Sequence, residues 1–298
     1  MTTEQAVRTS VAFLGLGQMG GPMAGHLCQA GYTVHGFDPD AKARGRFERA
    51  GGQVAGDELE AVRAGHVVML CLPTSEATVE LARGHLLPHL RRGQVVVDHG
   101  TTAVPATREL GQAAAARQAA WVDAPISGGE TGAQQAKLRL WVGGPDAAVA
   151  RVWPLITRFA ADDAITHMGP TGCGQIGKAV HQIKSGLATA AQLEAIAFGL
   201  RAGVEIQTLT RSFAGSDPSF ERMLERVKAG EPCPAESKFY EYAYYLAEAE
   251  ASNFRLPMIE ALSQLCHDQP RAYRDPVNRP VPSIWQALMQ ATRRPEPR

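Results

Sequence analysis

The sequence predicts an α/β fold over its first part and an all-helical region after it. Two observations support this prediction. Up to about residue 170, short runs rich in Val, Leu and Ile alternate with stretches long enough to form helices. Beyond Gly174 no further strand-like run is evident, and helical patterns follow one another. Such alternation is typical of βαβ units, so we expect an α/β domain at residues 1–170 and an all-helical domain at residues 171–298.

Each expected element has its own sequence signal. The strands are short apolar runs, at residues 11–14, 33–37, 66–72, 94–98, 120–125, 138–142 and, more weakly, 165–168. A proline-free segment rich in Ala, Leu, Ile and Gln predicts one long helix at residues 175–202. Shorter helices are expected at residues 209–213, 219–228, 240–251 and 257–267. The tail at residues 269–282 is rich in Pro and Arg and is expected to lie on the surface.

Composition argues against several classes of partner. Of the 298 residues, 45% are hydrophobic and 20% are charged, and 30 basic residues balance 30 acidic ones. This balance gives no support for a nucleic acid or an anionic membrane as partner. No apolar run is as long as a membrane span, the five cysteines are scattered, and no HExxH or Cys/His cluster suggests a metal. We therefore expect a cytoplasmic protein with reduced thiols, a small-molecule substrate and no metal.

The first expected strand runs directly into a glycine-rich GxGxxG turn. The turn consists of Gly15, Leu16, Gly17, Gln18, Met19 and Gly20. A helix pattern at residues 19–30 and a second strand follow it, which is the context that makes this otherwise weak motif specific. Gly15 permits the tight turn, Gly17 lets the backbone approach a pyrophosphate, and Gly20 lets helix and strand pack closely. The segment therefore predicts a dinucleotide-binding unit in a Rossmann-type doubly wound sheet, with the phosphates at the helix start.

An acidic residue ends the second expected strand. Asp38 can accept hydrogen bonds from the hydroxyl groups of an adenosine ribose, and it would repel a 2′-phosphate. This favours NAD over NADP as the cofactor. Lys42 and Arg44 lie close behind and keep NADP possible, although both also fit a solvated helix face.

Three spaced motifs resemble those of the β-hydroxyacid dehydrogenase family, which includes 3-hydroxyisobutyrate dehydrogenase, and more distantly 6-phosphogluconate dehydrogenase. The first is the GxGxxG turn, followed by Pro22-Met23-Ala24. The others are Asp123-Ala124-Pro125-Ile126-Ser127-Gly128-Gly129 and Gly172-Cys173-Gly174-Gln175-Ile176-Gly177-Lys178. Two smaller loops also match, and the resemblance implies that they contact the cofactor through Leu72, Pro73, Thr74 and Thr101. The resemblance covers nearly the whole chain and weakens after about residue 205.

The second and third motifs carry the candidate substrate site. Ser127, Gly128 and Gly129 offer a hydroxyl and unobstructed N–H groups that can hold a carboxylate. Composition alone favours an ordinary turn there, and the resemblance reverses that preference. Lys178 follows a helix start opened by glycines, where burial and the positive helix end would lower its pKa toward the working range of an acid/base. The plainer interpretation of Lys178 is a solvated helix lysine.

This chain departs from the family at the other expected substrate contacts. Gln182 stands where the family usually has asparagine, and His181 is either a substrate ligand or an interior histidine. The family's later Lys-Asp-Leu motif aligns with Tyr240-Glu241-Tyr242, so Tyr240 is a candidate contact; Lys238 would serve only if two residues were inserted. The aromatic residues at 239–245 fit core or interface packing, or an apolar substrate pocket. Gly100 replaces the family's usual serine.

The resemblance implies reversible hydride transfer between NAD(P) and a β-hydroxyacid or the corresponding aldehyde or keto compound, at the C-terminal edge of the strands. It also implies a homodimer or homotetramer built through the helical domain. One alternative is an imine reductase of the same architecture, although those enzymes usually have aspartate or tyrosine at the position of Lys178. The other is a nucleotide-binding sensor or scaffold that has lost catalysis, and such relatives would be expected to have lost this lysine.

Overall fold

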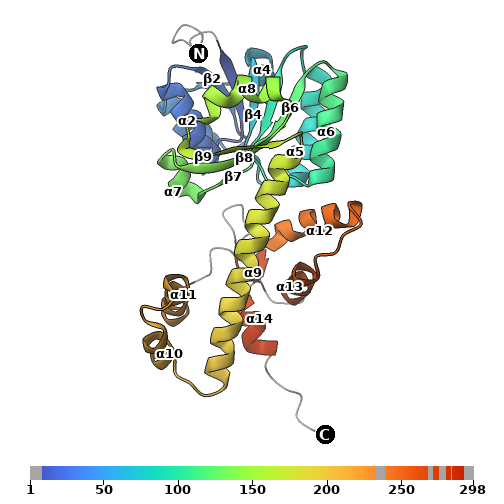
Figure 1. Ribbon diagram of the computed structural model, residues 1–298. Helices are drawn as coiled ribbons and strands as arrows, with labels where there is room; N and C mark the ends of the chain where they lie inside the picture. Colours follow the sequence, from blue (N-terminus) through green and yellow to red (C-terminus); the bar gives the residue numbers. More distant parts are fainter. Residues whose placement is uncertain (1–8, 232–238, 268–270, 275–279, 283, 292–298) are drawn as a thin grey trace. The chain divides into compact units, whose positions relative to one another are not determined.

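The computed structural model divides the chain into two compact units, Met1–Ala179 and Val180–Arg298. The residues that the structure describes are 9–231, 239–267, 271–274, 280–282 and 284–291. Helix α9 (Cys173–Arg201) begins in the first unit and ends in the second (Figure 1). Within the described ranges, no helix combines the length and apolarity that crossing a bilayer requires.

The first unit is built around a nine-stranded sheet of described residues. Its order is β3-β2-β1-β4-β5-β6-β8-β7, with β9 paired to β8. The strands are β1 (Ser10–Leu14), β2 (Thr33–Phe37), β3 (Gln53–Val54), β4 (Val67–Leu70), β5 (Val95–Asp98), β6 (Ala120–Asp123), β7 (Ile126–Ser127), β8 (Leu138–Gly143) and β9 (Ala160–Gly169). All pairs from β3 to β6 are parallel, whereas β8 runs antiparallel to β6 and β7 and parallel to β9. This confirms the predicted doubly wound α/β sheet.

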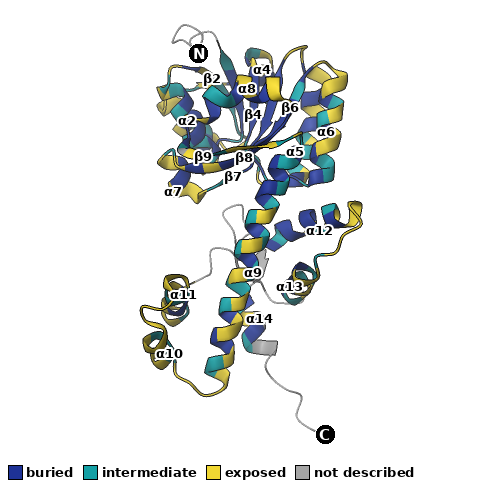
Figure 2. Ribbon diagram, viewed as in Figure 1, coloured by how far each residue is buried: buried dark blue, intermediate teal, exposed yellow. Residues whose placement is uncertain are grey.

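Helices cover both faces of this sheet. On one face Val11 and Phe13 of β1 pack with α2 (Gly20–Gln29), α3 (Ala41–Arg49) and α8 (Asp146–Ile156). The other face carries α4 (Glu58–Ala64), the short π-helix η1 (Ala82–Leu86) and α6 (Val104–Ala116). The remaining helices of the unit are α5 (Ser75–Leu81), η2 (Leu87–His89) and α7 (Gly129–Gln134). Because both faces are covered, the central strands are buried throughout (Figure 2), which explains their continuous apolar sequence.

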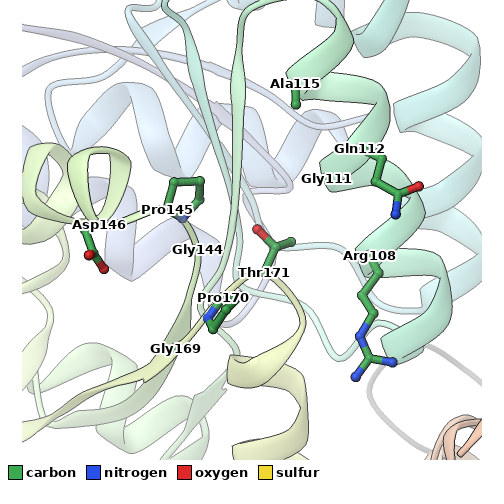
Figure 3. Close-up of a pocket in the computed structure, with 10 residues that line it drawn as sticks. All are labelled: Arg108, Gly111, Gln112, Ala115, Gly144, Pro145, Asp146, Gly169, Pro170 and Thr171. Carbon is green, nitrogen blue, oxygen red and sulfur yellow. The ribbon is translucent and has the colours of Figure 1, made fainter.

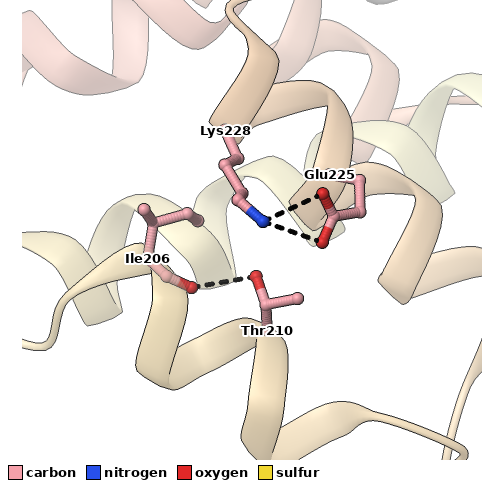
Figure 4. A network of polar contacts seen from close by, with 4 residues as sticks. All are labelled: Ile206, Thr210, Glu225 and Lys228. Atoms are coloured by element: carbon pink, nitrogen blue, oxygen red, sulfur yellow. Dashed lines mark hydrogen bonds and ion pairs between the residues drawn. The ribbon is translucent and has the colours of Figure 1, made fainter.

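The second unit is mainly helical. Beyond α9 it contains α10 (Ile206–Phe213), α11 (Pro218–Ala229), α12 (Tyr242–Ala251), α13 (Pro257–His267) and α14 (Ile284–Ala291). Helices α10 and α11 pack through Phe213 and Phe220, whose ring centroids lie 4.9 Å apart. Two polar contacts of these helices are local: Lys228 Nζ pairs with Glu225 at 3.2 Å, and the Thr210 hydroxyl donates to a backbone oxygen one turn earlier (Figure 4). Such exposed contacts contribute little stability.

The structure corrects the prediction that no strand follows Gly174. β10 (Arg271–Arg274) and β11 (Pro280–Pro282) pair antiparallel within the Pro- and Arg-rich tail. Their sequences lack apolar alternation, because a two-stranded ladder depends on backbone hydrogen bonds rather than on a buried face. Proline is tolerated in such a strand, since each strand of a lone pair is an edge. The two-residue strands β3 and β7 are likewise too short to give a periodic signal.

Candidate functional site

The glycine-rich turn after β1 has the geometry that a dinucleotide site needs. Gly15 has a φ of +91°, and a Cβ there would lie 2.4 Å from the carbonyl oxygen of Cys71. A Cβ on Gly20, the first residue of α2, would lie 1.9 Å from the oxygen of Gly15. By contrast, a Cβ on Gly17 would meet no atom within 4 Å. Gly15 and Gly20 are therefore required for packing, whereas Gly17 leaves open space beside the backbone where a pyrophosphate fits.

Asp38 is tied to the same turn. One oxygen of its carboxylate accepts the backbone N–H of Leu16 at 2.7 Å, and the other accepts that of Asp40 at 2.8 Å. The guanidinium of Arg44 donates to the backbone oxygens of Asp38 and Pro39 at 2.6 and 3.1 Å. A half-buried carboxylate held in this way is placed to receive ribose hydroxyls. The residues present thus fit a nicotinamide dinucleotide.

The loops after β4 and β5 also lie at the carboxyl ends of parallel strands. Thr74 caps α5, because its hydroxyl accepts the N–H of Ala77 at 3.0 Å. Leu72 and Thr101 are half-buried, and Pro73 lies between Leu72 and the cap. The hydroxyl that fastens the second loop is that of Thr102, which donates to Asp98 at 2.6 Å. Sequence reasoning selected Thr101 and missed Thr102.

Two neighbouring residues at the end of β5 have strongly altered acidity. Burial raises the pKa of the Asp98 carboxyl to about 7, while hydrogen bonds from Thr102 and Gly100 partly offset that rise. Burial lowers the pKa of the His99 imidazole to about 4. The His99 ring stacks on Phe13 and bonds the backbone oxygen of Ala124 at 2.9 Å. At neutral pH this histidine is therefore an uncharged part of the core.

The structure brings Lys178 to the Ser-Gly-Gly loop. Lys178 lies in the second turn of α9 with 6% of its surface exposed, and its Nζ donates to the backbone oxygen of Ile126 at 2.6 Å. Ile126 immediately precedes Ser127, which is half-buried. Gly128 has a φ of +138° and Gly129 a φ of +63°, so both need glycine, and Gly129 opens α7. The buried Lys178 amine therefore lies beside a loop whose two glycines are exposed.

The other predicted substrate residues belong to the second unit. Gln182 is buried and His181 half-buried on α9, one turn after Lys178. The hydroxyl of Tyr240 donates to Glu241 at 3.2 Å, and its ring lies edge-on to that of Tyr244, 6.5 Å away. Lys238 lies outside the described residues.

The aromatic segment around Tyr240 packs inside its own unit. Phe239, Tyr242, Tyr244 and Tyr245 are at most 8% exposed. The Tyr242 hydroxyl approaches α9 so closely that a Cβ on Gly186 would lie 1.7 Å from it. Packing is thus the structural role of most of this segment, and it explains why a glycine interrupts the long helix.

A surface pocket of about 670 Å³ lies next to the start of α9 within the first unit (Figure 3). One face of α6 and the loops after β8 and β9 line it, through Arg108, Gly111, Gln112, Ala115, Gly144, Pro145, Asp146, Gly169, Pro170 and Thr171. None of the predicted site residues is among them. No cluster of His, Cys, Asp and Glu that could hold a metal ion occurs among the described residues.

Comparison with known proteins identifies the fold and its relatives. Residues 10–169 match the family of the NAD binding domain of 6-phosphogluconate dehydrogenase. A 3-hydroxyisobutyrate dehydrogenase of Pseudomonas aeruginosa is 35% identical over 204 residues, which are 68% of each chain. An NAD-dependent L-serine dehydrogenase of the same organism is 35% identical over 67% of each chain.

Solved structures extend the likeness to most of the chain. The 3-hydroxyisobutyrate dehydrogenase of Mycobacterium tuberculosis, solved with L-serine, has a TM-score of 0.79 at 24% identity, covering 95% of this chain and 99% of that one. An imine reductase from Pseudomonas sp. has a TM-score of 0.60 at 19% identity, covering 87% and 92%. At these identities the likeness shows the fold alone.

Proposed function

Since the chain belongs to the β-hydroxyacid dehydrogenase family, it is an NAD(P)-dependent oxidoreductase acting on hydroxyl groups, and we propose that Lys178 serves as its acid and base. The observation that carries this proposal is the 2.6 Å hydrogen bond from Lys178 Nζ to the backbone oxygen of Ile126. This bond fixes the nitrogen beside the loop that offers a hydroxyl and N–H groups to a substrate. No other lysine lies in the three motifs.

The proposed chemistry uses this geometry in one proton transfer. NAD, held by the glycine-rich turn and Asp38, would supply the hydride acceptor for the carbon that bears the hydroxyl group. Lys178 Nζ takes the hydroxyl proton as the alcohol becomes an aldehyde or ketone, and returns it in the reverse direction. The hydrogen bond to the Ile126 oxygen holds Lys178 Nζ next to the residue that precedes Ser127, where we propose that the substrate oxygen lies.

The substrate that we propose is a small hydroxyacid, such as 3-hydroxyisobutyrate or L-serine, for which two relatives are named. Ser127 and the glycines at 128 and 129 hold its carboxylate. Gln182, His181 and Tyr240 are proposed as secondary substrate contacts. Support for Gln182 comes from its buried side chain one helical turn after Lys178, whose Oε1 has no hydrogen-bond partner within the described residues.

The cofactor that we propose to bind more tightly is NAD. The Asp38 carboxylate lies at the turn, whereas the guanidinium of Arg44, which also lies over the ring of Phe37, is engaged by backbone oxygens. The 2′-phosphate of NADP would lie beside the Asp38 carboxylate, which would repel it. We assign cofactor binding to residues 1–170, through the GxGxxG turn, Asp38, the loop at 72–74 and Thr101. Residues 171–298 are assigned to substrate binding and oligomerisation.

We further propose a cytoplasmic homodimer or homotetramer assembled through the helical unit. Large apolar side chains are exposed there: Phe198 is 74%, Phe254 62% and Met258 68% exposed. Exposed apolar surface of this kind commonly marks a protein–protein contact. Light scattering during size-exclusion chromatography tests the assembly, and a monomer at micromolar concentration would contradict it.

Steady-state rates of Lys178→Ala and His181→Ala test the acid/base assignment, after a panel of hydroxyacids, aldehydes and cyclic imines has identified a substrate. Lys178→Ala should lower kcat by roughly 10²–10⁴, the usual contribution of a positioned general acid or base. The affinity for NADH should stay nearly constant, because Lys178 lies outside the glycine-rich turn that we propose to hold the cofactor. If His181→Ala lost turnover and Lys178→Ala kept it, the histidine would be the acid. If only the imines were turned over, the protein would be an imine reductase. If no compound were turned over, a sensor or scaffold role would be favoured.

A further inference from the structure

A buried carboxylate from the sheet holds the start of α9. Asp123 ends β6 and is 0% exposed. One of its oxygens accepts the backbone N–H of Gly172 at 2.7 Å, and the other accepts that of Gln175 at 2.8 Å. Backbone N–H groups at a helix start have no acceptor within the helix itself. Asp123 thus caps α9 from a strand that lies about fifty residues earlier in the chain.

Glycines allow this contact to be as close as it is. A Cβ on Gly174 would lie 2.5 Å from the backbone oxygen of Asp123 and 2.8 Å from its Oδ2. A Cβ on Gly143 of β8 would lie 2.7 Å from Oδ1, and one on Gly177 would lie 2.7 Å from the ring of Trp141. Side chains at these positions would push the helix away from β6 and β8. The first turn of α9 is therefore fixed in place directly before the lysine.

Neutral hydrogen bonds fasten the same segment. The Thr171 hydroxyl donates to the backbone oxygen of Trp121 at 3.0 Å, and Gln175 Nε2 donates to that of Gly100 at 2.9 Å. Unlike these two bonds, those accepted by Asp123 involve a charged group. Burial raises the pKa of its carboxyl to about 6, and the bonds from the α9 backbone oppose that rise, so it is ionised at neutral and alkaline pH.

The charged groups near this carboxylate come from three elements. Asp98 is its register partner on β5, and the two carboxyl groups repel each other. Arg108 of α6 lies against the helix start, since a Cβ on Gly172 would be 3.1 Å from Arg108 Cγ. Lys178 follows on α9 itself. The helix start carries about half a positive charge, which disfavours an ammonium group nearby and which a carboxylate offsets.

We propose that Asp123 is a positioning residue for the reaction: it holds the first turn of α9 so that Lys178 Nζ lies against the Ile126 oxygen, and its charge offsets the positive helix end. The proposal rests on the proposed function, in which Lys178 is the acid and base. A purely structural cap would affect stability without altering how the reaction responds to pH.

The test compares Asp123→Asn with the parent protein in the oxidation of the best hydroxyacid by NAD, between pH 5.5 and 10. The plateau of kcat should fall about 10-fold, because the amide cannot accept both N–H groups. The acid limb of the pH profile of kcat should move to lower pH by about one unit, because the protonated form of Lys178 loses the nearby negative charge of Asp123. NADH affinity, measured by fluorescence titration, should not change. Thr171→Val is the matched control, since it removes a neutral bond between the same segment and β6; its pH profile should stay in place.

A pH profile of Asp123→Asn that coincides with that of Thr171→Val would overturn the proposal. Should Asp123→Asn not fold, Asp123→Ser takes its place, because the smaller hydroxyl keeps an acceptor without the charge. Failure of both variants to fold would reduce Asp123 to a folding residue and also overturn the proposal. Lys178→Ala in the same assay separates the two hypotheses. If it keeps turnover, the proposed function fails; if it loses turnover while Asp123→Asn keeps the parent profile, only this inference fails.

Discussion

Replacing Asp98 by asparagine should stabilise the protein at alkaline pH. Asp98 is 0% exposed, and its two oxygens accept the N–H of Gly100 at 2.9 Å and the hydroxyl of Thr102 at 2.6 Å. Asparagine has the same shape. Its carbonyl oxygen can accept from Gly100, and its amide can donate to the Thr102 oxygen once that hydroxyl rotates. The substitution therefore keeps both hydrogen bonds and removes a buried negative charge.

The magnitude follows from the pKa of about 7 that burial gives this carboxyl, against an ordinary value of 3.8. At about 1.4 kcal/mol per pH unit, ionised Asp98 costs the folded state about 4 kcal/mol. Because the folded pKa is raised, the stability that the neutral carboxyl contributes is complete below 3.8 and is lost as pH rises through about 7. Between pH 5 and pH 8 the parent protein should lose about 3 kcal/mol from this group, and Asp98→Asn should not.

Equilibrium urea unfolding of the two proteins, followed by tryptophan fluorescence at several pH values, measures the difference. Asp98→Asn should be more stable at pH 8 by about 2–4 kcal/mol, with the advantage shrinking toward pH 5, where the parent carboxyl is protonated. Asp163→Asn, an exposed position on β9, serves as control and should change nothing. A stability difference that does not vary with pH would refute the argument, as would a less stable Asp98→Asn at pH 8.

Three further predictions concern the cofactor and substrate residues. Asp38→Ala should weaken NADH binding about 10-fold and narrow the preference over NADPH, because the ribose loses its acceptor; fluorescence titrations with both cofactors measure this. Gly20→Ala should lower the free energy of unfolding by about 3 kcal/mol, because its Cβ would lie 1.9 Å from the oxygen of Gly15; urea unfolding checks it, and an unchanged midpoint would contradict it. Ser127→Ala should raise KM for a hydroxyacid about 10-fold with little loss of kcat, since a carboxylate clamp holds ground and transition states alike; a loss confined to kcat would place Ser127 in the chemistry.

The elements that carry the motifs could be predicted from sequence because their signals are local. The glycine spacing from Gly15 to Gly20 is a local pattern, and the clashes that a Cβ would meet at those two positions give its physical reason. The long helix could also be predicted, because a proline-free segment rich in Ala, Leu and Gln has a high helix propensity. Lys178 was found through its motif, yet its contact with Ile126 was not, because that contact joins residues 52 positions apart.

Apart from Thr102, the contacts that sequence reasoning missed join different strands and loops of the sheet. Asp98 and Asp123 are adjacent only because β5 and β6 pair in one particular register. Gln175 reaches Gly100 across 75 positions of the chain. Spacing along the chain cannot reveal such contacts, because the register and the direction of each strand must first be known. One signal was available: Asp98 ends an apolar run and Asp123 lies inside another, and carboxylates are uncommon in such runs.

The position of these two carboxyl groups argues that they are kept for the site rather than for the fold. A parallel sheet gains nothing from ionisable groups at the buried ends of its central strands, and burial raises the pKa of both. Yet Asp98 fastens the loop that leads to Thr101, and Asp123 fastens the helix that carries Lys178. If the Asp98 charge is kept for the site, Asp98→Asn should raise stability at alkaline pH and lower cofactor affinity or turnover. If Asp98→Asn gained stability but kept its cofactor affinity and its rate, the buried charge of Asp98 would have no role in the site.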